Sequence, residues 1–75
     1  MPWKDVILEA YTEARPYIVN VKWFKELLNK ILNEAKNLND VIKTVQNLLE
    51  SEDVVKQTDL KIFLMFLEKV MKGQR

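Results

Sequence analysis

Carboxylates are the side chains in this sequence that are best suited to chemistry. Asp5, Glu9 and Glu13 recur every four residues, which places them on one side of a helix, where they could bind a divalent cation. Carboxylates that bind a metal normally converge from several elements, whereas a stripe along one amphipathic helix usually faces solvent. We therefore interpret this stripe as a solvated face and expect no metal site.

Nucleophilic and acid–base catalysis have little support. The chain has one serine, Ser51, and neither Cys nor His, so thiolate nucleophiles, thiolate metal sites and imidazole bases are all missing. The single glycine, Gly73, lies near the C-terminus, and therefore no Gly-rich loop can hold a phosphate. We expect a protein that is not an enzyme and that needs no cofactor.

Lysines and asparagines on one face of the second predicted helix suggest a different chemistry, the recognition of nucleic acid. Lysines contact phosphates, and asparagines can read adenine edges. Glu26 and Glu34 interrupt the helix, and a net charge of +1 attracts phosphate only weakly. A solvated face is the favoured interpretation, and a small nucleic-acid-binding protein is the alternative function. The residues that would carry it are Lys22, Lys25, Asn29, Asn33 and Lys36.

Helices must position all of these residues. One Gly in 75 residues leaves little room for tight β-turns, and the apolar residues recur at helical spacing throughout. We predict an all-α fold, a compact antiparallel bundle of four short helices, or of three if Pro16 is only a kink. A chain of this length allows a single domain, residues 1–75.

The ends of the helices have recognisable signals. Pro16 ends the first helix or opens the second, and Asn20 is a possible N-cap if the second helix starts late. Asn37 or Asn39 can cap the third helix, and Gly73 is a plausible residue to follow the last. The predicted helices cover about 2–15, 16–36, 38–51 and 59–72.

The longest connection is predicted between the third and fourth helices, over 51–57. Val54 and Val55 are expected to tuck back onto the core. Thr58 is the expected N-cap of the last helix, with Asp59 in its first turn, where a carboxylate is favourable.

The second predicted helix carries an apolar seam with alternating steps of four and three residues, which suits the core or a second copy of the chain. The residues of this seam are Tyr17, Val21, Phe24, Leu28, Ile31 and Ala35. Most of the aromatic residues lie in the first third of the chain, and Trp3 and Trp23 are expected to close one end of the bundle.

A surplus of apolar residues is the best functional signal. Apolar residues make up 48% of the chain, and the last helix has more of them than one groove needs. A contiguous exposed group of such residues marks an interface, and here Lys61, Lys69 and Lys72 would form its polar rim. The candidate partner-binding residues are Leu8, Tyr11, Trp23, Ile62, Met65 and Phe66.

No targeting or membrane segment is visible. The start of the chain has no charged region followed by an apolar stretch, and the longest apolar run, 62–67, is far shorter than the ~20 residues that span a bilayer. We therefore expect a cytoplasmic protein.

The amino-acid composition of the chain is similar to that of a known group of proteins. This Lys- and Ile/Leu-rich chain without Cys or His resembles small proteins of thermophilic archaea, although its six asparagines depart from a strict thermophile bias. In size and helical content it is similar to the short accessory subunits of archaeal replicative DNA polymerases. The resemblance implies a non-enzymatic accessory subunit of a larger complex. The expected partner is a larger protein, such as a DNA polymerase, or a second copy of the chain.

Overall fold

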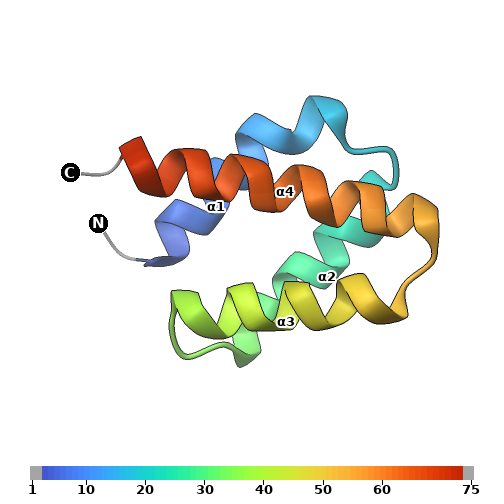
Figure 1. The fold of residues 1–75 in the computed structure, drawn as a ribbon. Coiled ribbons are helices and arrows are strands. Elements are labelled where there is room, and N and C mark those ends of the chain that lie inside the picture. The colour runs from blue at the N-terminus through green and yellow to red at the C-terminus, as the bar shows by residue number, and fades with distance from the viewer. Residues whose placement is uncertain (1–2, 74–75) are drawn as a thin grey trace.

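Four α-helices make up the fold in the computed structural model, which describes residues 3–73 (Figure 1). The all-α prediction is confirmed, and no strand occurs within this range. The short 3₁₀ turn η1 separates the first two helices, so the three-helix alternative is wrong. The elements are α1 (Trp3–Ala14), η1 (Arg15–Tyr17), α2 (Val21–Glu34), α3 (Leu38–Ser51) and α4 (Val54–Gly73).

Residues singled out in the sequence lie at three of the helix ends. Pro16 lies in η1, directly after α1, because its ring disfavours a helical residue before it. Asn20 takes the N-cap position of α2, although its side chain makes no capping hydrogen bond. Asn37 caps α3, where its Oδ1 accepts a hydrogen bond from the Asp40 backbone N–H at 2.9 Å.

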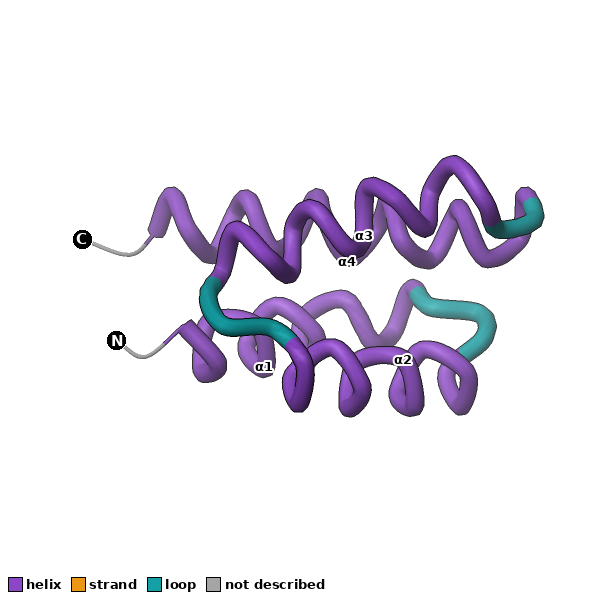
Figure 2. The backbone as a smooth tube through the Cα atoms, turned by 90° about the horizontal axis from the view of Figure 1, so that it is seen from below, coloured by secondary structure: helices purple, strands orange, loops and turns teal. Residues whose placement is uncertain are grey.

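Successive helices run in opposite directions and form two layers. One layer contains α1 and α2, and the other contains α3 and α4 (Figure 2). The described chain begins and ends at the same end of the bundle (Figure 1). Because α1 and α2 start at opposite ends, Trp3 and Trp23 do not close one end together, and that prediction is wrong.

Close packing of α1 against α4 builds most of the core. Ala10 and Ala14 are fully buried, and their small side chains allow the two backbones to approach closely. The remaining core side chains come from all four helices and from the segment between α1 and α2. They are Val6, Ile7, Ile18, Phe24, Leu28, Ile31, Val41, Val45, Leu60, Phe63, Leu67 and Val70.

The last helix begins five residues earlier than predicted. The connection from α3 to α4 is only residues 52–53, and the Asp53 Oδ1 accepts a hydrogen bond from the Lys56 backbone N–H at 3.0 Å. Thr58 is therefore inside α4, and its hydroxyl donates to the Val54 carbonyl oxygen. Val54 and Val55 do not tuck onto the core, since they are 76% and 53% exposed.

Asp59 is not a first-turn residue but a buried side chain in the middle of α4. Its Oδ1 accepts a hydrogen bond from the Val19 backbone N–H at 2.9 Å, and its Oδ2 accepts one from the Asn20 backbone N–H at 2.8 Å. A carboxylate beside the N-terminus of α2 also interacts favourably with the helix dipole. Asp59 thus holds the start of α2 against α4.

The end of α4 also differs from the prediction. Gly73 is the last residue of the helix rather than the residue after it, and no glycine in the described range has a positive φ. Among the apolar residues of α4, Leu60, Phe63, Leu67 and Val70 are buried, but Leu64 is only half-buried and Met71 is 37% exposed.

Candidate partner-binding surface on the last helix

The helix α4 is apolar on nearly all of its sides. Four of its apolar side chains face the core, and others lie on the side near η1 and on the side near α3. Lys61, Glu68 and Lys72, spaced seven and four residues apart, form a narrow polar stripe between these two sides. A helix of this kind has apolar area left over after it has packed in the core.

Four side chains near η1 form an apolar depression of about 350 Å³. We call this surface the outer patch; its residues are Tyr17, Ile62, Met65 and Phe66. Met65 is 59% exposed and Tyr17 is 61% exposed, whereas Ile62 and Phe66 are half-buried. The half-buried side chains form the floor of the depression, and the exposed ones are free to contact a partner.

Aromatic contacts shape the outer patch. The rings of Tyr17 and Phe66 stack with their centroids 5.5 Å apart and their planes 19° apart. The Lys69 Nζ lies 5.9 Å from the centroid of the Phe66 ring, within the range of a cation–π interaction. The patch therefore combines two aromatic rings and a flexible methionine, which are residue types enriched at protein interfaces, with the Lys69 ammonium group at its edge.

Tyr17 reaches the patch because of the break between α1 and α2. Pro16 turns the chain into η1, so Tyr17 does not continue into the apolar seam of α2, where it was predicted. The next residue, Ile18, is buried, and Asp59 binds the two backbone N–H groups that follow. Both contacts hold Tyr17 against α4. Sequence reasoning missed this residue, although Pro16 was a usable signal.

The six predicted partner-binding residues do not all meet. Ile62, Met65 and Phe66 lie together in the outer patch, but Leu8 is an exposed residue of α1 that does not line it.

Tyr11 and Trp23, the other two, pack inward. The Tyr11 ring stacks on Phe24 at 5.9 Å, and the Trp23 ring meets Phe24 edge-on at 6.1 Å. Phe24 in turn contacts Phe63 at 5.2 Å. Both half-buried rings therefore extend the core, and the Lys56 Nζ lies 5.2 Å from the centroid of the Trp23 ring.

The apolar seam of α2 packs in the core of the same molecule. Phe24, Leu28 and Ile31 are buried against the other helices. Because these side chains are covered by the fold itself, a second copy has no access to the middle of this seam.

The Lys/Asn face is exposed along α2. Lys22, Lys25, Asn29 and Asn33 follow the three- and four-residue spacing of one helix side, and all four are exposed. Lys36 lies beyond the end of the helix, where its backbone N–H donates to the Asp40 Oδ2 at 3.0 Å. The face is therefore one residue shorter than predicted.

Residues suited to catalysis do not come together. Asp5, Glu9 and Glu13 are exposed on α1, and the Ser51 hydroxyl donates to the carbonyl oxygens of Asn47 and Leu48 within its own helix. Among residues 3–73, no three acidic side chains are placed to hold a metal ion together.

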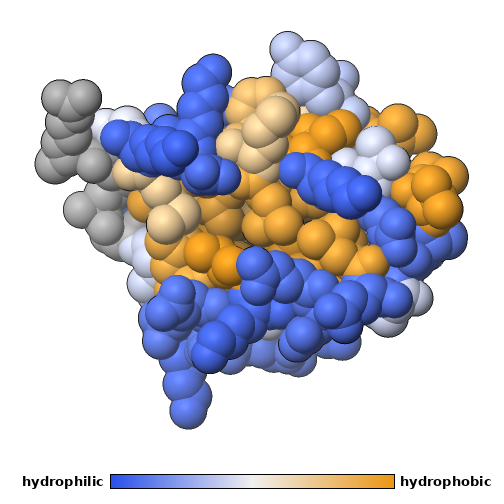
Figure 3. Space-filling view, in the orientation of Figure 1, coloured by the Kyte–Doolittle hydropathy of each residue, from blue (hydrophilic) through white to orange (hydrophobic). Residues whose placement is uncertain are grey.

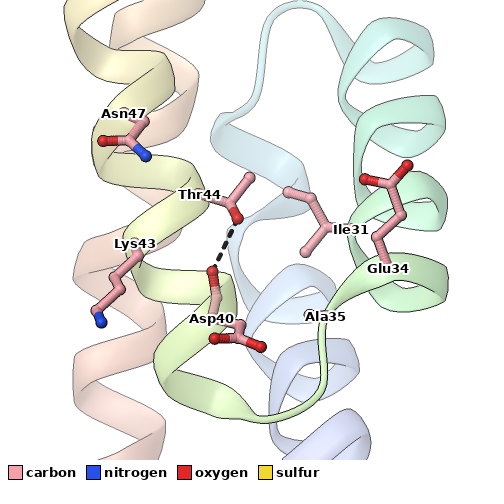
Figure 4. Close-up of a pocket in the computed structure, with 7 residues that line it drawn as sticks. All are labelled: Ile31, Glu34, Ala35, Asp40, Lys43, Thr44 and Asn47. Atoms are coloured by element: carbon pink, nitrogen blue, oxygen red, sulfur yellow. Dashed lines mark hydrogen bonds between the residues drawn. The ribbon is translucent and has the colours of Figure 1, made fainter.

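A second depression, of about 260 Å³, lies between the end of α2 and the start of α3 (Figure 4). It contains two carboxylates, Glu34 and Asp40. Asp40 already stabilises the start of α3, because its Oδ2 accepts from the Lys36 backbone N–H and its carbonyl oxygen accepts from the Thr44 hydroxyl at 2.8 Å. Asp40 and Thr44, two of the polar residues of this depression, therefore stabilise the start of α3.

The lengths and compositions of the four helices bear on whether one of them could cross a membrane. Within the described range, none of them combines the length and the apolar content needed to cross a bilayer.

Comparison with known proteins places the chain in a family. No curated protein and no solved structure matches it significantly. The model of the MJ1579 family matches residues 4–72, a range that reaches from the first turn of α1 to the last turn of α4. The chain therefore belongs to the MJ1579 family.

Proposed function

We propose that this protein is a non-enzymatic helical interaction module that binds a larger protein through the outer patch. The observation that carries the proposal is the gathering of Tyr17, Ile62, Met65 and Phe66 around one apolar depression. Exposed apolar groups of this kind mark interaction sites, and tyrosine is among the residue types enriched at binding hot spots.

The charges beside the outer patch favour a partner that differs from this chain. Lys61 and Lys69 are both exposed on α4 next to Met65. In a symmetric contact between two outer patches, these ammonium groups would face ammonium groups, which is unfavourable. The partner that fits is an apolar segment flanked by Asp or Glu, which could be an amphipathic helix of a larger protein.

The resemblance to archaeal polymerase subunits supports a more specific proposal. An accessory subunit of a DNA replication complex would need no chemistry of its own, only a surface for docking. A replicative DNA polymerase is therefore the first partner to test.

A crosslinking experiment tests the outer patch directly. A photo-crosslinking amino acid at position 65 is expected to capture one partner segment that contains apolar residues with acidic neighbours. The same amino acid at position 12, exposed on α1, is the control and is expected not to capture it.

Binding to the captured partner provides the quantitative test. Met65→Asp is expected to weaken the interaction at least about tenfold, as removal of one hot-spot contact does, while Thr12→Asp leaves the affinity unchanged. Equal capture from both positions, or an affinity that Met65→Asp does not alter, would contradict the proposal.

The Lys/Asn face of α2 supports the alternative, direct binding of nucleic acid. Within residues 3–73, Lys22 and Lys25 make no ion pair, so both are available to phosphates. Binding of a fluorescent oligonucleotide would then weaken steeply with added salt, and Lys22→Glu with Lys25→Glu would abolish it. Binding that is absent at low salt would exclude this alternative.

A further inference from the structure

Beside the outer patch, α4 has a second apolar surface on the side that faces α3. Figure 3 shows a band of apolar side chains across this face of the molecule, with hydrophilic residues above and below it. Within the band lies a groove of about 270 Å³, which we call the α3–α4 groove. It is lined by Ile42, Gln46, Leu64, Leu67, Glu68 and Met71.

The groove keeps apolar area that the fold does not cover. Ile42 and Leu64 are half-buried, and Met71 is more than one third exposed. Since α3 and α4 are antiparallel neighbours (Figure 1), the groove runs along both helices and suits a helical surface as its occupant.

The charges on the α4 edge of the groove have opposite signs. Lys61 and Glu68 are exposed and seven residues apart, which is about two helical turns, or roughly 10 Å along the axis. Leu64 and Met65 lie midway between them. Glu68 pairs with Lys72 at 3.1 Å, but both side chains are largely exposed, and a carboxylate can accept from a second ammonium group.

When two copies of this helix surface face each other in antiparallel orientation, each positive charge meets a negative one. If two copies of α4 pair antiparallel about a two-fold axis between residues 64 and 65, Lys61 of each copy lies opposite Glu68 of the other. Such a contact is isologous, so one favourable pair is always made twice. A symmetric contact centred on the other side of Met65 lacks this property, because Lys61 and Lys69, the exposed charges that would then face each other, have the same sign.

We propose that a second copy of the chain covers the α3–α4 groove, with the two-fold axis passing between Leu64 and Met65. The molecule measures 34 × 25 × 19 Å, so one of its larger faces can supply the roughly 800 Å² per partner that a stable interface needs. This dimer leaves Tyr17, Ile62 and Phe66 open, but it brings Met65, which also belongs to the outer patch, close to the two-fold axis. Capture of a second copy from position 65 would therefore support the dimer, and capture of a different protein would support the partner proposed above.

Charge reversal tests the dimer without disturbing the core. In sedimentation equilibrium of the full chain, Lys61→Glu alone and Glu68→Lys alone are each expected to raise the dimer Kd roughly tenfold, because two exposed ion pairs change from attraction to repulsion. The double variant restores both pairs and is expected to regain the original Kd. A mixture of the two single variants is expected to form a heterodimer.

Two further measurements complete the test. Lys69→Glu reverses a charge beside the outer patch and is expected to leave the dimer Kd unchanged. Added salt should reduce the differences among the variants, since surface charges are screened.

A chain that stays monomeric up to millimolar concentration would overturn the proposal. So would a dimer whose Kd changes with Lys69→Glu, or one whose Kd is the same in the single and double variants.

Discussion

Asp59 links two parts of the fold that are distant in sequence. Its carboxylate is fully buried and accepts the backbone N–H groups of Val19 and Asn20. These two donors precede the first turn of α2, where the chain leaves η1. One side chain thus determines where α2 starts relative to α4, and with it the position of Tyr17 in the outer patch.

Replacing Asp59 is expected to lower the free energy of unfolding, and the loss should grow with the number of backbone N–H groups that are left without an acceptor. Asp59→Ala abandons two backbone N–H groups and should lower the free energy of unfolding by about 2 kcal/mol or more. Asp59→Asn keeps one oxygen acceptor and should lose about half as much. Urea denaturation followed by circular dichroism measures both, and a loss under about 0.5 kcal/mol for Asp59→Ala would contradict this role.

The two asparagines at helix starts give a matched pair of variants. Asn37→Ala removes a side chain that accepts from the Asp40 N–H, and we expect a loss of about 1 kcal/mol in unfolding free energy. Asn20 makes no capping bond, and its buried Nδ2 has no hydrogen-bond partner. Asn20→Ala should therefore change stability by less than about 0.5 kcal/mol. Equal losses in both variants would show that the Asn37 bond is not what stabilises α3.

At the scale of elements, the sequence predicted a helix end correctly where a single residue with a strong preference stands at that end. Pro16 and Asn37 mark the helix ends that the structure shows. The start of α4 had two competing signals, because Asp53 and Thr58 are both good N-cap residues. In the structure the Asp53 Oδ1 accepts the Lys56 N–H, Thr58 lies inside the helix, and Asp59 and Leu60 are packed in the interior. Periodicity alone cannot supply that information.

The α1–α4 pair depends on small residues at its closest approach. We expect Ala10→Leu to lower the free energy of unfolding by about 1–3 kcal/mol, because a larger side chain at a fully buried position forces the helices apart. Thr12→Leu, on the exposed side of the same helix, should change it by less than about 0.5 kcal/mol. Thermal and urea unfolding of the two variants provide the comparison. If Ala10→Leu left the free energy of unfolding unchanged, α1 and α4 would be able to move apart without loss of stability.

At the scale of the whole molecule, an antiparallel four-helix bundle was predictable from the single glycine and the helical spacing. The grouping of the surplus apolar residues was not. Helical spacing placed Ile62 and Phe66 beside the core face of the last helix and Met65 on its polar side. It could not show that these three residues meet Tyr17 or that Tyr11 and Trp23 turn inward. Those assignments depend on how neighbouring helices are rotated about their own axes.

The bundle is expected to unfold as one unit. Because the first and last helices form its main contact, a fragment of residues 1–51, which lacks α4, loses the partner of α1 and the acceptor for the start of α2. We expect this fragment to show little helix by circular dichroism and no cooperative thermal transition. A fragment that retains a sharp transition would locate the core in the first three helices instead.

The same pairing has a consequence during synthesis on the ribosome. Of the four helices, α1 leaves the exit tunnel first and α4, which covers it, leaves last, so the bundle has no stable intermediate before α4 emerges. Folding of the bundle must wait until α4 has emerged from the exit tunnel. Translation that stops early should therefore yield unfolded chains open to proteolysis rather than shortened proteins that still bind a partner.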